Sequence, residues 1–152
     1  FGVELKNLRA PGLRMYKSEP GGGTTDYAIE IFHAAIEENN YTCFLREDAY
    51  LPMMYMPDAI RATIELMESD AKQITIRTSY NISGMSFSPK EISKEIENHI
   101  PGFTITYQPD YRQSIAESWP QSIDDSIAKK YWNWTPKSNL EKIATDMSAN
   151  LT

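Results

Sequence analysis

Three glycines and two threonines, Gly21 to Thr25, are the residues whose types and spacing best suit ligand binding in this sequence. Glycines let a backbone approach a ligand closely and let a loop open and close. The Thr24 and Thr25 hydroxyls stand beside the N–H groups of an expected helix start, where they can hold a carboxylate or phosphate oxygen. The same pattern also fits a flexible turn with a threonine as N-cap, and the residues alone favour neither interpretation.

Familiar catalytic motifs are missing from the 152 residues. Asp26 stands where the last glycine of a GxGxxG would fall, and no tyrosine is followed four residues later by lysine. His33 and His99 lie far apart and lack ligand-type neighbours, so the sequence predicts no metal site. Asp124 and Asp125 are expected in a first helical turn, where carboxylates stabilise the helix dipole more often than they transfer protons. The sequence therefore predicts a binding edge with no catalytic group.

Tryptophan and cysteine residues give further hypotheses. Trp132 and Trp134 are expected to anchor the C-terminal segment on the core. Trp119 follows a helical stripe and precedes a turn, so it fits either a packing role or a pocket wall. Cys43 lies in an apolar run, which indicates a buried, unreactive thiol, and a single cysteine suits a reducing compartment.

Composition excludes some classes of protein. The net charge is -6 and no segment is dominated by Lys or Arg, which argues against nucleic-acid binding. No apolar run approaches the roughly 18–20 residues that span a bilayer, so no membrane segment is expected. Because Phe1 opens a strand pattern at once, we interpret the chain as a fragment or as trimmed at its N-terminus.

The elements that must position these residues alternate between strand and helix. Strand patterns cover residues 1–8, 41–45, 51–56, 74–82 and 103–107. Helical patterns follow Thr24 or Thr25, Pro57, Ser88 and Ser122, and a last one follows Ser138 or Asn139. The alternation predicts an α/β protein with short strands gathered into a small second sheet.

Local signals define several helix ends. Ser88 with Glu91 forms a capping box with proline at the first helical position, and Ser122 with Asp125 is predicted to form a second box. Thr24 or Thr25 is expected to cap the first helix, and Ser138 or Asn139 the last. The predicted buried stripe of the helix after Pro57 consists of Ala59, Ile60, Thr63, Ile64 and Met67.

Longer stretches resemble one family. These are PGGGTTDYAIEIF at 20–32, LPMMYMPDAIRATIELM at 51–67, SYNISGMSFSPKEI at 79–92 and DYRQSIAESWPQSIDDSIAKKYWNW at 110–134. Together they resemble the C-terminal half of the short-chain-type L-threonine 3-dehydrogenases, which are extended short-chain dehydrogenases related to NAD-dependent sugar epimerases and dehydratases. The resemblance covers nearly the whole chain.

The resemblance implies the C-terminal part of a Rossmann-like fold. Residues 1–20 would be a final Rossmann-side strand and loop, and residues 21–152 mainly a substrate-binding lobe. The GxGxxG, the catalytic Tyr and its Lys would lie in an N-terminal Rossmann domain upstream, so this chain would hold no catalytic residue and would be inactive alone. The implied reaction oxidises the β-hydroxyl of L-threonine with NAD⁺ and gives 2-amino-3-oxobutyrate.

The resemblance also implies site residues. Backbone at Pro11, Gly12 and Leu13 would touch the nicotinamide end of NAD. Gly23, Thr24 and Thr25 would close over L-threonine, and Trp119 would complete the pocket. The similar enzymes commonly carry a larger residue at the position of Ala10.

Further expectations are a homodimeric full-length protein and a cytoplasmic location, or the mitochondrial matrix in a eukaryote. One alternative is half of a sugar-nucleotide epimerase or dehydratase, for which Arg77 and Arg112 would be candidate diphosphate ligands. The other alternative is a non-catalytic binding module. A Tyr-x-x-x-Lys upstream of Phe1 would separate an enzyme from such a module.

Overall fold

Short strands and helices alternate along the computed structural model, which describes residues 6–14, 20–76 and 78–151. The α/β class predicted from the sequence is therefore correct. The elements are β1 (Leu8–Arg9), β2 (Gly12–Arg14), α1 (Tyr27–Glu38), β3 (Asn40–Cys43), β4 (Leu51–Tyr55), α2 (Met56–Glu68), β5 (Tyr80–Asn81), β6 (Met85–Phe87), α3 (Pro89–His99), β7 (Thr104–Tyr107), α4 (Tyr111–Glu117), α5 (Ser126–Trp132) and α6 (Leu140–Leu151).

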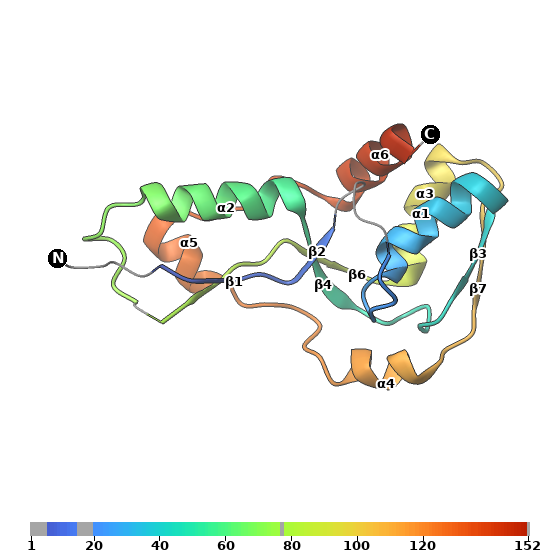
Figure 1. The fold of residues 1–152 in the computed structure, drawn as a ribbon, viewed down its shortest axis with the longest axis horizontal. Helices are drawn as coiled ribbons and strands as arrows, with labels where there is room; N and C mark the ends of the chain where they lie inside the picture. The colour runs from blue at the N-terminus through green and yellow to red at the C-terminus, as the bar shows by residue number, and fades with distance from the viewer. Residues whose placement is uncertain (1–5, 15–19, 77, 152) are drawn as a thin grey trace.

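The strands form three small sheets. In the middle of the molecule, β4 pairs in parallel with β2 and antiparallel with β6 (Figure 1). On one side the parallel pair β1–β5 lies with α2 and α5, and on the other the parallel pair β3–β7 lies with α1, α3 and α6. The β1–β5 and β3–β7 pairs each join segments more than sixty residues apart, so these sheets hold distant parts of the chain together.

The chain changes sheet at Ala10 and Pro11. β1 ends before them and pairs with β5, whereas β2 begins at Gly12 and pairs with β4. The three-residue strand that follows Pro11 was not predicted. Most of the strand predicted at 1–8 lies outside the described residues. The strand predicted at 74–82 shortens to Tyr80–Asn81.

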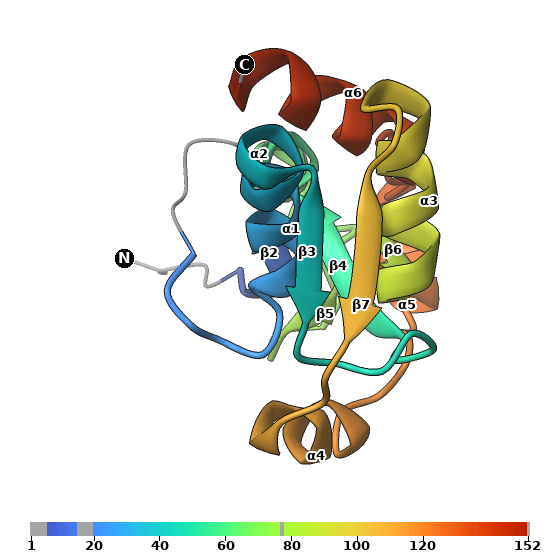
Figure 2. The same cartoon turned by 90° about the vertical axis from the view of Figure 1, so that its right-hand side faces the viewer.

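The largest core cluster lies around α1. Its Tyr27, Ile31 and Phe32 are fully buried, and α1 lies with α3, α6 and the β3–β7 pair in the lobe that faces the viewer in Figure 2. Asn39 adopts the left-handed conformation, with φ of 57°, and ends the helix. Cys43 is also buried here, and burial raises its pKa to about 11, so the thiol stays protonated at neutral pH.

The capping box that opens α3 is confirmed. The Glu91 N–H donates to Ser88 Oγ at 3.3 Å, and the Ser88 N–H donates to Glu91 Oε2 at 3.1 Å. Asn139 likewise caps α6 by accepting the Lys142 N–H at 2.8 Å.

The second capping box, from Ser122 to Asp125, is wrong. Helix α5 begins only at Ser126, and Asp125 is its N-cap residue but makes no side-chain cap. The Asp125 carboxylate instead accepts hydrogen bonds from Ser83 and Lys129, while Asp124 accepts the Ser126 N–H. Side-chain partners at Ser83 and Lys129 therefore take this carboxylate in place of the helix end.

Helix α2 turns a different face to the core than predicted. It begins with Pro57 in its first turn, as expected, but its buried residues are Asp58, Ala59, Ala62 and Leu66. The Ile60, Ile64 and Met67 side chains are 54%, 48% and 69% exposed. Because the Asp58 carboxylate accepts hydrogen bonds from the backbone of Lys137 and Ser138, the Asp58 row must face inward and the isoleucines outward.

β4 holds the middle sheet tightly. All five of its residues are buried, and Gly84 lies so close that a Cβ there would stand 2.5 Å from the Met53 carbonyl oxygen. Only glycine fits that approach. Pro52 is tolerated in β4 because the β2 pairing starts one residue later, at Met53, where an N–H is available.

Candidate functional site

A cavity of about 350 Å³ opens where the Gly-rich loop, the start of β2, β4 and the α4–α5 connection meet. Its lining is formed by Ala10, Pro11, Gly12, Thr25, Pro52, Trp119, Pro120 and Ile123. None of these described lining residues is charged. Residues predicted to contact NAD and residues predicted to contact L-threonine therefore line one cavity, next to the point where the chain changes sheet.

The structure brings four of the seven predicted site residues together. Pro11, Gly12, Thr25 and Trp119 all line the cavity, although they come from three separate parts of the chain. Leu13, Gly23 and Thr24 are not in this lining. Leu13 is 38% exposed on β2, and Thr24 is buried, at 8% exposed.

The Gly-rich loop is held by its own aspartate. Asp26 Oδ2 accepts the N–H groups of Gly21 at 2.7 Å and Gly23 at 2.9 Å. Asp26 is also the residue before α1, so the prediction that Thr24 or Thr25 caps this helix is wrong. The Asp26 side chain makes no cap hydrogen bond to α1 either, because its carboxylate accepts the two loop N–H groups instead. These two N–H groups are consequently occupied within the protein.

Trp119 belongs to the segment between α4 and α5, residues 118–125, which we call the wall segment. Its indole is 43% exposed beside Pro120, and Ile123 completes the wall farther along. The sequence had left Trp119 open between packing and a pocket wall, and the structure places it in the wall.

Ala10, Pro52, Pro120 and Ile123 line the cavity without having been predicted. The register of β4 and the path of the wall segment bring Pro52 and Ile123 there. Nothing in their local sequence signals this role, whereas Ala10 and Pro120 at least adjoin predicted residues.

The arrangement can bind and orient a ligand, but it supplies no acid or base. The Thr25 hydroxyl and the Trp119 indole N–H are the side-chain hydrogen-bonding groups of the lining. An apolar space with a few polar groups is typical of small-molecule sites. Proton transfer would require a residue beyond this lining.

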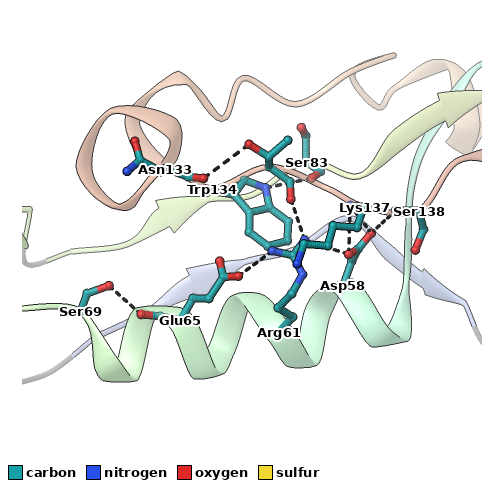
Figure 3. Close-up of polar contacts among 10 residues, drawn as sticks. Asp58, Arg61, Glu65, Ser69, Ser83, Asn133, Trp134, Lys137 and Ser138 are labelled. Carbon is teal, nitrogen blue, oxygen red and sulfur yellow. Dashed lines mark hydrogen bonds and ion pairs between the residues drawn. The ribbon is translucent and has the colours of Figure 1, made fainter.

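A polar network fixes the C-terminal segment to α2 and to the β5–β6 connection (Figure 3). The buried Asp58 carboxylate accepts the Ser138 N–H at 2.8 Å and an Arg61 N–H at 2.9 Å. Arg61 lies over the ring of Trp134, with 4.5 Å between the guanidinium carbon and the ring centroid. Trp134 is fully buried and donates to the Ser83 carbonyl at 3.1 Å, so its predicted anchoring role is confirmed.

Burial alone would raise the pKa of Asp58. Hydrogen bonds from Arg61, Ser138 and Lys137 outweigh that effect and hold the pKa below the usual 3.8. Asp58 therefore remains ionised throughout the neutral range.

Within the ranges that the structure describes, no cluster of three or more His, Cys, Asp or Glu is arranged to hold a metal ion. In the same ranges, no helix combines the length and apolar character needed to cross a bilayer. Arg77, one of the two candidate diphosphate ligands, lies outside the described residues. Arg112 pairs with Asp110 at 2.7 Å and stacks on Phe44, away from the cavity.

Comparison with known proteins gives consistent relatives. The chain is 47% identical over 148 residues to the mitochondrial L-threonine 3-dehydrogenase of Bos taurus, covering 97% of this chain and 39% of the bovine protein. It is 49% identical over 141 residues to an uncharacterized epimerase/dehydratase of Staphylococcus haemolyticus, covering 92% of this chain and 44% of that protein. The chain thus spans less than half the length of these curated relatives. No protein-family model matches it.

Solved structures give relatives of the same kind. The GalE-like L-threonine dehydrogenase of Cupriavidus necator superposes with a TM-score of 0.94 at 57% identity, over 99% of this chain and 54% of that one. An ADP-L-glycero-D-manno-heptose-6-epimerase of Helicobacter pylori, at 16% identity and a TM-score of 0.74, shares the fold.

Proposed function

Because this chain is homologous to the C-terminal half of the L-threonine 3-dehydrogenases and of related epimerase/dehydratases, we propose that it forms the substrate-binding half of an NAD-dependent L-threonine 3-dehydrogenase. Such an enzyme oxidises L-threonine to 2-amino-3-oxobutyrate. One observation carries the proposal: Pro11 and Gly12, assigned to the cofactor side, share a cavity with Thr25 and Trp119, assigned to the amino-acid side.

The cavity suits one end of NAD. The nicotinamide ring of NAD⁺ is flat and its positive charge is delocalised, so it can pack on apolar surfaces. The lining offers such surfaces at Pro11, Pro52 and Ile123, with no charged described residue. Pro11 and Gly12 would contact this ring, with Leu13 beside them, and the cofactor, when bound, would accept a hydride. The chain contains no GxGxxG, so the phosphates would be held by the upstream half.

The amino-acid side is assigned to Thr25 and Trp119, with Thr24 and Gly23 supporting the loop. The Thr25 hydroxyl would hydrogen-bond L-threonine, and the Trp119 indole would exclude water from it. The chain itself supplies no group to remove the β-hydroxyl proton, because the lining has no acid or base. That group would come from the upstream half.

The partner of this chain would be the upstream Rossmann domain. The exposed row Ile60, Ile64 and Met67 on α2 presents apolar surface next to the two-stranded parallel pair β1–β5. Parallel sheets are normally covered on both faces and have more strands. The upstream half would supply this cover. We also propose that the full-length protein is a homodimer in the cytoplasm, or in the mitochondrial matrix if the source is a eukaryote.

A chimera tests the function. Residues 1–152 would follow the upstream half of the Cupriavidus necator enzyme, and NADH formation would be recorded with L-threonine and with UDP-sugars. We expect threonine-dependent NADH from the chimera and none from residues 1–152 alone. The Cupriavidus necator enzyme is the positive control.

Three outcomes would reject the proposal. Turnover by residues 1–152 alone would place the catalytic groups in this chain. Turnover of UDP-sugars instead of L-threonine would favour an epimerase or dehydratase. A folded chimera that binds NAD but turns over neither substrate would favour a binding module.

A further inference from the structure

The wall segment has little support of its own. Between residues 120 and 124, its backbone makes no hydrogen bond to the backbone of any other described residue. Trp119, Pro120 and Gln121 are exposed, and Ile123 is half-buried. Helix α4, from which the segment departs, lies apart from the other helices at the lower edge of Figures 1 and 2. The position of Trp119 therefore depends on how the two ends of the segment are attached.

A buried glutamine attaches the first end. Gln113 in α4 is 8% exposed, and its Oε1 accepts the Arg46 N–H at 2.8 Å. Its Nε2 donates to Glu117 Oε1 at 3.0 Å, and Glu117 also pairs with Arg46 Nη1 at 2.6 Å. The last turn of α4 then holds Trp119 directly, because the Trp119 N–H donates to the Ala116 carbonyl at 3.1 Å.

A buried aspartate attaches the second end. Asp125 is 4% exposed, and Ser83 Oγ donates to its Oδ2 at 2.5 Å. Lys129 Nζ lies 2.7 Å from Oδ1. Ser83 is fixed in turn, since its carbonyl accepts the indole N–H of buried Trp134 at 3.1 Å. The carboxylate thus ties the wall segment to the β5–β6 connection.

Neither Gln113 nor Asp125 lines the apolar cavity. A second cavity, of about 120 Å³, includes both Gln113 and Trp119 in its polar lining. The indole therefore has adjoining space to enter if either attachment is lost.

We propose that Gln113 and Asp125 are positioning residues, which hold Trp119, Pro120 and Ile123 against the ligand cavity from both ends of the wall segment. This inference rests on the proposed function, since the cavity is the assigned L-threonine site. If the wall segment moves, the ligand loses its orientation and activity falls. A displacement of about 1 Å can lower activity by up to roughly a hundredfold.

The first test is kinetic and uses the chimera. Asp125→Ala and Gln113→Ala should each raise the KM for L-threonine about tenfold or more. The KM for NAD⁺ should rise less, because Ile123 is the one wall residue assigned to the nicotinamide ring. Asp125→Asn keeps an acceptor for the Ser83 hydroxyl and should restore much of the loss. Asp146→Ala removes a carboxylate that pairs with Lys142 on α6, outside the wall segment, and is the control, expected to leave both KM values unchanged.

The second test observes the wall directly. In a ¹H–¹⁵N spectrum, the indole N–H signal of Trp119, identified by its loss in Trp119→Phe, should shift or broaden in Asp125→Ala but not in Asp146→Ala. An unchanged Trp119 signal and an unchanged KM for L-threonine in folded Asp125→Ala would overturn the proposal. If the unmutated chimera lacked threonine turnover, the proposed function would fail, while this spectrum would still decide whether Asp125 positions the wall.

Discussion

Two adjacent threonines in the Gly-rich loop have different surroundings. Thr25 lines the cavity, whereas Thr24 is buried and is not part of the lining. The sequence treats the two as equivalent, because both precede α1 and both carry a hydroxyl. Backbone geometry distinguishes them, since neighbouring side chains in a turn point in different directions.

This difference predicts that substitutions of Thr24 and Thr25 have unequal effects on activity. In the chimera, Thr25→Val keeps the shape of the side chain but removes the hydroxyl, and it should lower kcat/KM for L-threonine about tenfold. Thr24→Val should change it less than twofold, and the KM for NAD⁺ should be unaffected in both. Steady-state kinetics measures these values. Equal losses for the two variants would contradict the assignment of Thr25.

Asp26 shows why residue roles at this loop were hard to predict. The pattern of three glycines and two threonines suggests N–H groups that await a ligand anion, yet Asp26 already occupies two of them. A sequence lists the available donors and acceptors but not which pairs form. The same limit explains Asp125, whose partner Ser83 is 42 positions away.

At the scale of elements, local signals predict the starts of α3 and α6 correctly but not the caps of α1 and α5 or the buried face of α2. The Ser88–Glu91 capping box and the Asn139 cap are correct because their partners lie within three residues. Strands β2 and β6 have three residues each, too few to show an alternating pattern. In α2 both candidate faces are apolar, so periodicity cannot decide between them. The hydrogen bonds that Asp58 accepts from the Lys137 and Ser138 N–H groups determine which face is buried.

Asp58 joins α2 to the C-terminal segment, which predicts an acid-dependent stability. Its folded pKa is lowered below 3.8, so its stabilising contribution is present above that pH and is lost as the pH falls through the folded pKa. In the chimera, Asp58→Asn should lower stability by about 1.5–3 kcal/mol at pH 7, since it weakens hydrogen bonds to a charged group.

Unfolding midpoints at pH 7, 5 and 3 test this prediction. The gap between Asp58→Asn and the unmutated chimera should be similar at pH 7 and 5 and smaller at pH 3. Asp146→Asn is the control, because Asp146 pairs with Lys142 on the surface of α6 and such pairs contribute little. A gap that stays constant down to pH 3 would refute the charge-based account.

The whole molecule consists of two lobes joined through the β2–β4–β6 sheet (Figure 1). The lobe with α1, α3 and α6 has the largest core cluster, whereas the lobe with β1, β5 and α2 has smaller clusters and an exposed apolar row. This asymmetry is what a substrate lobe attached to part of a larger sheet would show. It agrees with the coverage of about half of each relative.

Thiol labelling can test whether the upstream half covers the exposed apolar row Ile60, Ile64 and Met67 on α2. In the chimera, Ile64→Cys should react at least about tenfold more slowly than Glu97→Cys on α3, because burial of apolar surface excludes reagent from position 64. Both positions are exposed in this chain, so the difference would come from the upstream half. Labelling is read by mass spectrometry at each position. Equal rates at the two positions would place the upstream half elsewhere.

The contact of Asp58 with Ser138 also orders events in time. The two residues are 80 positions apart, so a ribosome adding about 5–20 residues per second makes the acceptor roughly 4–16 seconds before its donor. During that interval the Asp58 carboxylate of α2 lacks the backbone N–H groups of Lys137 and Ser138, which donate hydrogen bonds to it in the folded protein. Closure of the α2 lobe therefore waits for the last stretch of the chain, and nascent chains halted before Lys137 should be sensitive to protease at α2.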